Sequence, residues 1–353
     1  MGLRILTYKE IDRSQWEKLV RESRTGTWFQ SPEAYRLFAS MPELFRPFAI
    51  AVERVNELTN ERTLRGVCVG YVTKEKGWLK QYFTRRAIIQ GGPVLANDAS
   101  SEEVELLMNA VRKQLVIGDW LLVNGPIYIE TRNFEDYSKW KEAFERAGFE
   151  YKKHLNFHID CTDKERMWEG LSEVRRRQIR KAVNNGARIK SEGISEAEIR
   201  EWYQILSRLY RTKVKRPVFE EAFFQEAYRQ GMAKYLLVKH EGKVIGGMMI
   251  VSSSSCVYEW YICGMDAEYK EQYPSVMATW AAMEYENEHG LARFDVMGAG
   301  VPDVPYGVRD FKAEFGGKLV EQGRFLCVCK PWLYRLGTFV VKLLKRKKQI
   351  KPF

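Results

Sequence analysis

The chain lacks the features that define membrane and secreted proteins. Its 353 residues contain no apolar run of the ~18 residues needed to cross a bilayer. The N-terminal segment also lacks the apolar stretch and small-residue cleavage site of a secretory signal. We therefore expect a cytoplasmic protein without a membrane-spanning helix.

Metal-ligating and disulfide patterns are missing as well. The 4 histidines show no zinc-ligand spacing, and several of the 6 cysteines lie in strand-like apolar runs. Cys327 and Cys329 alternate as strand residues do. We expect no metal site and no disulfide framework among these cysteines: Cys68, Cys161, Cys256, Cys263, Cys327 and Cys329.

The motifs of common catalytic centres are absent too. The sequence has no G-x-S-x-G, no P-loop and no H-E-x-x-H. An enzyme with this sequence would therefore align two substrates and stabilise developing charge with Lys, Arg and Tyr side chains.

Acidic residues are outnumbered, with 46 Asp and Glu against 57 Lys and Arg, for a net charge of +11. Such a balance favours a polyanionic partner. Nucleic acid, an anionic membrane face and a phosphorylated substrate all satisfy it, so charge alone does not choose among them.

Hydrophobic periodicity indicates an α+β protein in which one plan is used twice. Each half shows a strand, helices, antiparallel strands, a helix and a strand. We expect a first domain over residues 1–152, a second over 153–326, and a tail over 327–353. The predicted elements include a strand at Trp120–Val123 and one long helix over Asp163–Asn184.

The segment between the predicted strand Phe294–Met297 and a strand-like run from Leu319 to Phe325 draws attention to Lys312. The strand around Phe294 runs into Gly298 and Gly300, and glycines there permit sharp turns or close approach to a ligand. Phe311 and Phe315 flank Lys312. One interpretation is a partly buried lysine that binds a phosphate, a carboxylate or an oxyanion. The other is a lysine whose stem packs on the rings while its ammonium stays in water.

Two clusters of basic residues precede this segment. The first lies on a predicted helix and the second in a loop, residues 211–217. Cations this close repel one another unless an anion neutralises them. Contact with tRNA or phosphate is one interpretation, and a solvated helix face is the other. The helical cluster comprises Arg175, Arg176, Arg177, Arg180 and Lys181.

The tail combines apolar residues at helical spacing with a basic end, Lys345–Lys348. A helix of this kind binds an anionic membrane surface at the inner face of the cell membrane. Alternatively, its apolar face packs on the first domain.

Several segments in this order resemble the FemABX family of peptidoglycan-bridge aminoacyltransferases. In the first half the matching segment is Thr27–Ser31. The matching segments of the second half are Asn184–Gly186 after the basic helix, Lys215–Pro217, Tyr258–Tyr261, Gly264 with Asp266, Tyr273–Ser275, Phe294–Asp295 with Gly298–Gly300, and Val308–Gly317.

The resemblance implies two GNAT-like domains in tandem, with mixed central sheets flanked by helices and a basic C-terminal helix. It also implies transfer of an amino acid from aminoacyl-tRNA to a stem-peptide amine of a peptidoglycan precursor, linked to a nucleotide or a lipid. By position, Lys312 and Tyr261 would be catalytic, and Arg36 and Arg216 would bind the precursor's phosphates. The spacing from Gly186 to Pro217 leaves no room for the coiled-coil insertion of some members.

The resemblance implies no cofactor besides aminoacyl-tRNA as co-substrate. Enzymes with this fold that use acyl-CoA cradle its pyrophosphate with a glycine-rich turn before a helix. The equivalent residues here, Glu268–Ser275, contain no glycine and one proline. Two alternatives remain: an N-acyltransferase of envelope polysaccharide or lipid synthesis, and a non-catalytic module that binds RNA or anionic lipid.

Overall fold

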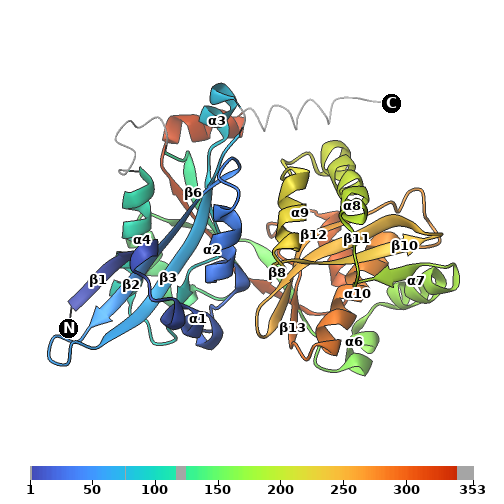
Figure 1. The fold of residues 1–353 in the computed structure, drawn as a ribbon, viewed down its shortest axis with the longest axis horizontal. Coiled ribbons are helices and arrows are strands. Elements are labelled where there is room, and N and C mark those ends of the chain that lie inside the picture. Colours follow the sequence, from blue (N-terminus) through green and yellow to red (C-terminus); the bar gives the residue numbers. More distant parts are fainter. Residues whose placement is uncertain (1, 76, 117–124, 340–353) are drawn as a thin grey trace. The chain divides into compact units, whose positions relative to one another are not determined.

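The computed structural model describes residues 2–75, 77–116 and 125–339. It divides into two compact units, residues 1–153 with 322–353 and residues 154–321. Each unit is a mixed β-sheet with helices on its faces, drawn in Figure 1. The boundary expected at residue 326 differs from this division, because β15 (Arg324–Val328) pairs with β6 and β7 of the first sheet.

Within the described residues, the first sheet has the order β1-β2-β3-β4-β6-β15-β7, with β5 paired to β3. Only the β4–β6 pair among these is parallel. The other strands are β1 (Gly2–Thr7), β2 (Phe45–Val55), β3 (Arg62–Thr73), β4 (Ala87–Gly91), β5 (Val94–Leu95), β6 (Tyr128–Asn133) and β7 (Glu150–Lys152). The expected strand Trp120–Val123 lies outside the described residues.

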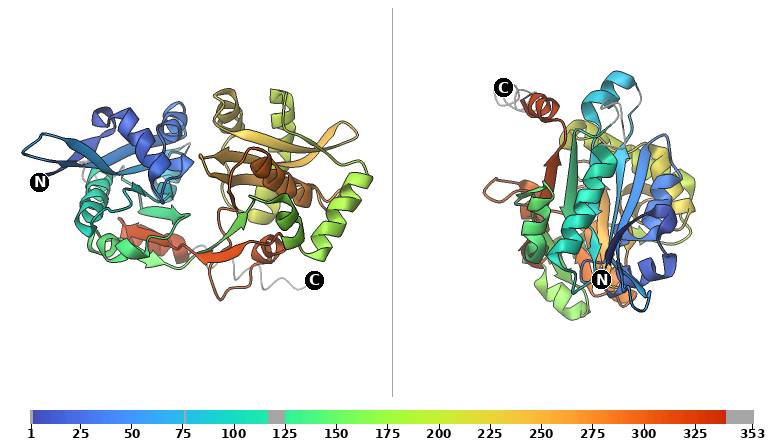
Figure 2. Two further views of the ribbon diagram at one scale, coloured as in Figure 1. Left: turned by 90° about the horizontal axis from the view of Figure 1, so that it is seen from below. Right: turned by 90° about the vertical axis from the view of Figure 1, so that its left-hand side faces the viewer.

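Helices cover both faces of the first sheet. α4 (Ser101–Val116) lies along one face, where its apolar side packs on β2 and β3, as Figure 2 shows. α1 (Arg13–Glu22) packs on the opposite face through Trp16. The remaining helices are η1 (Tyr8–Glu10), η2 (Trp28–Gln30), α2 (Pro32–Ala39), α3 (Trp78–Thr84), η3 (Ser138–Trp140) and α5 (Lys141–Arg146).

The buried side chain of Gln30 joins β3 to β4 at a point where their direct pairing is interrupted. Its amide nitrogen donates to the carbonyls of Val69, at 2.9 Å, and Gln90, at 2.8 Å. Its amide oxygen accepts from the Val69 N–H at 2.7 Å. Gln30 is fully buried, so one side chain satisfies three main-chain groups that water does not reach.

The second sheet has the order β14-β8-β13-β12-β11-β10-β9 in the described residues. β12 and β13 pair in parallel, and α10 connects them in the sequence. The other strand pairs are antiparallel. The strands are β8 (Leu155–Asp160), β9 (Arg188–Lys190), β10 (Lys234–His240), β11 (Lys243–Ser252), β12 (Cys256–Gly264), β13 (Arg293–Asp295) and β14 (Lys318–Glu321).

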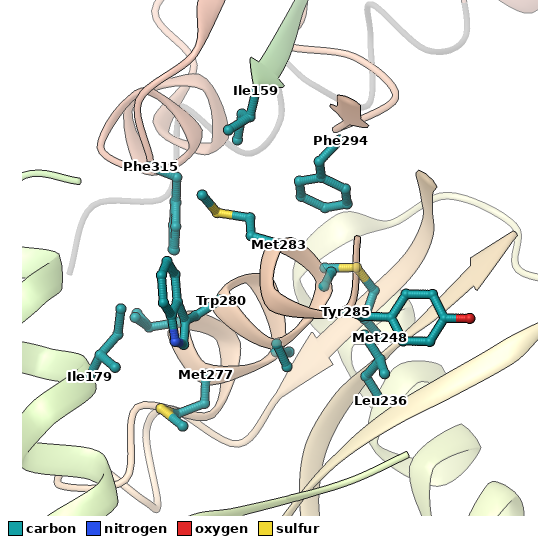
Figure 3. Close-up of a cluster of buried hydrophobic side chains, with 14 of the residues drawn as sticks. Ile159, Ile179, Leu236, Met248, Met277, Trp280, Met283, Tyr285, Phe294 and Phe315 are labelled. Atoms are coloured by element: carbon teal, nitrogen blue, oxygen red, sulfur yellow. The ribbon is translucent and has the colours of Figure 1, made fainter. Parts of the chain in front are cut away.

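The core of the second unit forms around α10 (Pro274–Glu288), which is buried along most of its length. Trp280 of this helix meets Trp168 edge to face, with ring centroids 5.3 Å apart. Figure 3 shows Phe315 beside Trp280, and the side chain of Met283 extending toward Phe315. The segment that carries Lys312 is thereby anchored to the core by Phe315. The other helices are α6 (Lys164–Gly170), α7 (Glu173–Asn184), α8 (Glu196–Leu209), the π-helical turn η4 (Tyr210–Val214), α9 (Glu221–Arg229) and α11 (Gly307–Ala313).

The single long helix expected over Asp163–Asn184 is wrong, because the chain breaks between α6 and α7. Leu171 is extended, and Ser172 begins the new helix by accepting from the Arg175 N–H through its hydroxyl. The Ser172 N–H donates to the carbonyl of Glu314 at 2.9 Å. The break therefore joins α7 to the end of α11.

The described start of the tail is helical over residues 331–339 and lies against the first unit. Leu333 is buried, and the Tyr334 ring meets the Tyr128 ring at 5.7 Å between centroids. The basic end of the tail lies outside the described residues. Where the structure describes the chain, none of its helices combines the length and apolar character that crossing a membrane requires.

Replacement of Gln30 by leucine should strongly destabilise the protein. Three buried main-chain groups would lose their partners, and each unsatisfied group costs ~1–3 kcal/mol, so we expect a loss of about 3 kcal/mol or more. Denaturant unfolding measures it. Gln114→Leu on the exposed face of α4 is the matched control, with an expected change within about 0.5 kcal/mol. Equal midpoints for the two variants would contradict the role assigned to Gln30.

Glu286 on α10 should make stability depend on pH. It is fully buried, and burial raises the pKa of its carboxyl from 4.5 to about 8. Between these values the folded protein holds a proton that the unfolded chain releases, so stability falls as pH rises through this window. Glu286→Gln should flatten the decline in denaturation midpoints measured from pH 5 to 8. An unchanged decline in the variant would show that other groups cause it.

Candidate active site

β12 and β13 part inside the second sheet. Their parallel pairing ends at Tyr258 with Asp295, where β13 also ends, whereas β12 continues to Gly264 alongside β11. A register shift places Trp260 as an extra residue between Glu259 and Tyr261. Such bulges bend a strand away from its neighbour. We call the position of Glu259, next to the last pair, the strand-parting point.

The chain turns sharply after β13, and two buried side chains fix this turn. Asp295 accepts from the Met297 N–H at 2.7 Å, and Asn156 accepts from the Gly298 N–H at 2.7 Å. Asn156 also donates its amide to Asp295 at 2.9 Å. The backbone at Gly298 has φ of 122°, which a residue with a side chain rarely adopts. The carbonyls of Val296 and Gly298 are thereby held in defined positions.

The ammonium of Lys312 on α11 binds at the strand-parting point. It donates to the carbonyls of Val296, at 2.5 Å, and Gly298, at 3.2 Å, and pairs with the Glu259 carboxylate at 2.8 Å. These three partners match the three donors of an ammonium group. Lys312 and Glu259 are each only 7% exposed, so the interpretation that the ammonium stays in water is wrong.

Burial and the Lys312 ammonium shift the pKa of the Glu259 carboxyl in opposite directions. Desolvation raises the pKa of the Glu259 carboxyl, while the adjacent Lys312 ammonium lowers it. The pair therefore lies in surroundings where electrostatic interactions are much stronger than in water.

Three tyrosines and an arginine lie near this pair. The rings of Tyr210 and Tyr261 have centroids 6.0 Å apart, and Tyr261 is half-buried on β12. Burial raises the pKa of Tyr210 to about 12, an effect that Arg216 opposes and Glu259 and Tyr306 reinforce. Arg216 is exposed in the loop after η4. Tyr210 thus connects two of the predicted site residues, Tyr261 by ring contact and Arg216 by charge, to Glu259, the partner of Lys312.

Arg175, expected to contact tRNA, is instead a buried structural residue. Its guanidinium lies 4.4 Å from the ring centroid of Phe311 and 5.3 Å from that of Phe315. It also donates to Gln178 at 2.6 Å and approaches Glu314 at 3.5 Å. The cation on the two phenylalanine rings is therefore Arg175, which joins α7 to the helix that carries Lys312.

Of the other basic residues of α7, Arg176 is half-buried, whereas Arg177, Arg180 and Lys181 are exposed, two of them with partners on the protein. Arg176 donates to main-chain carbonyls at the end of α6, at 2.9 Å for Glu169 and Leu171. Arg180 lies over the Trp168 ring, and Lys181 pairs with Glu271 at 2.5 Å. Arg177 is exposed. The surface that remains for an anion is thus smaller than the sequence suggested.

Arg36 lies on α2 of the first unit. Its guanidinium pairs with Glu33 at 3.1 Å, and Glu33 also pairs with Arg13 at 2.8 Å. About half of the Arg36 side chain is exposed. A role for Arg36 in substrate binding remains a prediction.

The N-terminus of α10 carries an anion supplied by the chain itself. Asp266 accepts from the Ser275 N–H at 3.0 Å and from its hydroxyl at 2.6 Å. Pro274, the first residue of the helix, has no N–H to offer. The donors that a helix start presents to a ligand are therefore partly used internally.

The corresponding strands of the first unit do not part in this way. β4 pairs with β6 along its whole length, from Ala87 to Gly91. At the start of α4, Glu103 accepts from the Ser100 N–H at 2.8 Å and also pairs with Arg54 and Arg65. Within the described residues, the parting of strands around a buried ion pair is a feature of the second unit.

Several functional candidates were not singled out from the sequence. Glu259 interrupts an apolar strand, and this single carboxylate was the available clue. Tyr210 lies between the apolar end of α8 and a basic loop. The carbonyls of Val296 and Gly298 depend on backbone geometry, which no residue type reveals.

Comparison with protein families identifies the type of domain. A family model described as an acetyltransferase (GNAT) domain matches residues 173–312. This span contains α7, the strand-parting point and Lys312. The match supports an acyltransferase. No curated protein matches the sequence significantly.

Solved structures with the same fold extend over nearly the whole chain. The crystal structure of FemX is similar with a TM-score of 0.67 and 14% identity, over 95% of this chain and 99% of that one. The C-terminal domain of a putative lysylphosphatidylglycerol synthetase from Agrobacterium fabrum has a TM-score of 0.52 and 13% identity, over 90% and 91%.

A tandem GNAT protein from the clavulanic acid biosynthesis pathway has a TM-score of 0.51 and 10% identity, over 93% of this chain and 99% of that one. The prediction of two GNAT-like domains in tandem is confirmed, and the resemblance stated from the sequence agrees with the fold of FemX. At these identities the likeness concerns the fold.

Substitutions at Arg175 and Arg177 should separate structural from surface cations. Arg175→Ala removes a buried guanidinium stacked on two rings, and we expect a loss of about 1–3 kcal/mol in unfolding free energy. Arg177→Ala, on the exposed side of the same helix, should change it by less than about 0.5 kcal/mol. Denaturant unfolding of both variants gives the comparison. Similar losses in both would contradict the assignment.

Proposed function

We propose that the protein transfers an aminoacyl group from aminoacyl-tRNA to an amine of a peptidoglycan precursor. The observation that carries the proposal is the buried Lys312 ammonium at the strand-parting point, paired with Glu259, which in turn interacts with Tyr210. The fold of FemX and the family resemblance support the same reaction class.

In this reaction the neutral amine of the acceptor attacks the ester carbonyl of the aminoacyl group. A C–N bond forms, the bond to the ribose oxygen breaks, and the proton lost by the amine passes to that oxygen. Negative charge develops on the carbonyl oxygen during attack, and a fixed cation in dry surroundings stabilises it. Lys312 supplies this cation. Its contact with the Gly298 carbonyl, at 3.2 Å, is the longest of the three and the one most easily exchanged for a substrate oxygen.

The start of α10 favours a tRNA ester over acyl-CoA as the donor. A pyrophosphate placed there would meet the Asp266 carboxylate and would lack an N–H from Pro274. The pyrophosphate and the carboxylate are both negative, so they would repel each other strongly. The chain thus places a negative group where acyl-CoA enzymes bind one.

The exposed cations would bind the anionic parts of the substrates. Arg216 and Arg36 are assigned to the precursor's phosphates, and Arg177 with Arg180 to the tRNA backbone. The basic tail would bring the protein to the inner membrane surface, where a lipid-linked precursor resides. In this proposal no cofactor takes part besides the tRNA.

A second candidate is aminoacyl transfer to an anionic lipid. The observation that favours it is the likeness, with a TM-score of 0.52, to the domain of a putative lysylphosphatidylglycerol synthetase. The same lysine and the same donor would serve, and only the acceptor would differ. Both acceptors belong in one assay.

The first test is transfer of labelled amino acids from a pool of charged tRNAs to nucleotide-linked precursor, lipid-linked precursor and phosphatidylglycerol vesicles. We expect label on a precursor. Lys312→Met should lower the rate by about 10²-fold or more, the usual cost of losing an oxyanion-stabilising group. Transfer to vesicles alone would establish the second candidate.

A matched variant separates catalysis from folding. Lys312→Met alone leaves Glu259 buried without its partner, which is destabilising. The double variant Lys312→Met with Glu259→Gln makes both positions neutral and should fold, as judged by circular dichroism, yet remain inactive. Full turnover in either variant would refute the catalytic assignment. No transfer by folded wild-type protein would favour another acyl donor, tested by acyl-CoA binding.

A non-catalytic module predicts the opposite pattern. Lys312→Met would then leave the cellular phenotype intact, while charge reversal on α7 would abolish it. Because Arg175 is structural, the reversal belongs at Arg177, Arg180 and Lys181, which lie on the exposed side of the helix.

A further inference from the structure

Glu259 is the charged side chain that contacts Lys312 in the described part of the chain. It lies on β12 within the run Cys256–Cys263, whose other residues are apolar or aromatic. Its carboxylate approaches the Lys312 ammonium at 2.8 Å, and the two side chains are equally buried. The remaining partners of the ammonium are neutral carbonyls.

Stability alone does not account for this carboxylate. Moving two charges out of water is costly, and apolar residues of similar size at such positions are often neutral or stabilising. A strand of a GNAT-like core would therefore be expected to carry an apolar residue at position 259. The pair is retained at the strand-parting point, next to Tyr210 and Tyr261.

The proposed reaction sets conflicting demands on two amines. The acceptor amine attacks only when it has lost its proton, while Lys312 stabilises an oxyanion only when it keeps its own. Burial by itself favours the neutral form of a lysine and so makes it lose its proton at lower pH. An adjacent carboxylate reverses this effect, and it thereby separates the pH ranges in which the two amines ionise.

We propose that Glu259 is a positioning residue of this reaction, which fixes the Lys312 ammonium at the strand-parting point and keeps it protonated while the acceptor amine is neutral. The proposal rests on the proposed function. Glu259 itself touches no substrate in this scheme and acts through Lys312.

Other charged groups face the pair from each neighbouring element. Asp295 on β13 interacts with Glu259, and it is approached by His158 on β8 at 3.2 Å. Burial raises the pKa of Tyr210 on η4 to about 12, and Arg216 lies in the loop that follows η4. Beyond Phe311 and Phe315 lie Arg175 on α7 and its partner Glu314. A Glu259 variant keeps all of these neighbouring residues, so its comparison with the wild type reports the effect of losing the Glu259 carboxylate.

The decisive experiment replaces Glu259 with glutamine and titrates Lys312 directly. Protein labelled with 13C at the lysine ε-carbons gives the Lys312 signal, which is assigned by its loss in Lys312→Met. We expect the pKa of Lys312 to fall by about one unit or more in Glu259→Gln, because a buried lysine has lost its carboxylate partner.

Transfer kinetics give the second readout. In Glu259→Gln, the alkaline limb of the kcat profile should move to lower pH by the same amount as the Lys312 titration. At pH values above the shifted pKa, kcat should be about 10-fold or more below that of the wild type, since each pH unit beyond a required pKa lowers the active fraction tenfold. KM should stay within about twofold, because Glu259 does not bind substrate.

Two variants serve as controls. Glu259→Asp keeps the charge on a shorter side chain and should restore part of the alkaline activity. Glu286→Gln removes another buried carboxyl of the same unit, one that is not among the partners of the Lys312 ammonium, and it should leave the limb in place. A purely structural role for Glu259 would change the stability and leave the limb unmoved.

The outcomes separate the two proposals. Transfer with an unmoved Lys312 titration in Glu259→Gln would overturn the role of Glu259 and leave the proposed function intact. A shifted titration in a protein that transfers nothing would overturn the proposed function, and with it the catalytic meaning of the pair. If Glu259→Gln does not fold, the titration of Glu259→Leu, a neutral apolar replacement of similar size, decides, and a Lys312 pKa equal to that of the wild type overturns the inference.

Discussion

A buried ammonium ion must be surrounded by acceptors, and much of the second unit serves this requirement for Lys312. Asn156 and Asp295 fix the turn whose carbonyls accept from the ammonium. The parting of β12 from β13 brings Glu259 to the same point. Arg175, stacked on Phe311 and Phe315, holds the helix that carries the lysine against α7. A cation that is fixed in this way needs no reorganisation when charge develops beside it.

The two units share one arrangement of strands and helices but differ at their parallel strand pair. In the first, β4 stays paired with β6 to its end, and the Gln30 amide joins β3 to β4 where their direct pairing is interrupted. In the second, the corresponding strands separate around an ion pair. The start of the helix between the two parallel strands is bonded to a carboxylate in both units, Glu103 in the first and Asp266 in the second. The first unit thus keeps its parallel strands paired, while the second unit places a buried ion pair where its parallel strands separate.

Sequence patterns predicted the alternation of strands and helices and the α+β class, because periodicity and residue type report burial and local turns. They also included a partly buried Lys312 as one of two interpretations, and this burial is confirmed. They failed where tertiary contacts decide the outcome. Arg175 reads as one cation in a basic run, yet two aromatic rings from a distant helix bury it. The break at Leu171–Ser172 depends on a bond to Glu314, more than a hundred residues away. Glu259 has a role only through a lysine on another element.

Two of the three partners of Lys312 belong to the main chain, and this has a consequence for recognising such sites elsewhere. A carbonyl oxygen is present whatever residue bears it, so the interaction itself sets no requirement on the side chain at position 296, which is restricted only by its burial in the core. Gly298 is restricted by its backbone angle rather than by its carbonyl. Related sites in divergent chains will therefore share a turn geometry and a lysine while their letters differ, and they are better sought by comparing backbones than by comparing sequences.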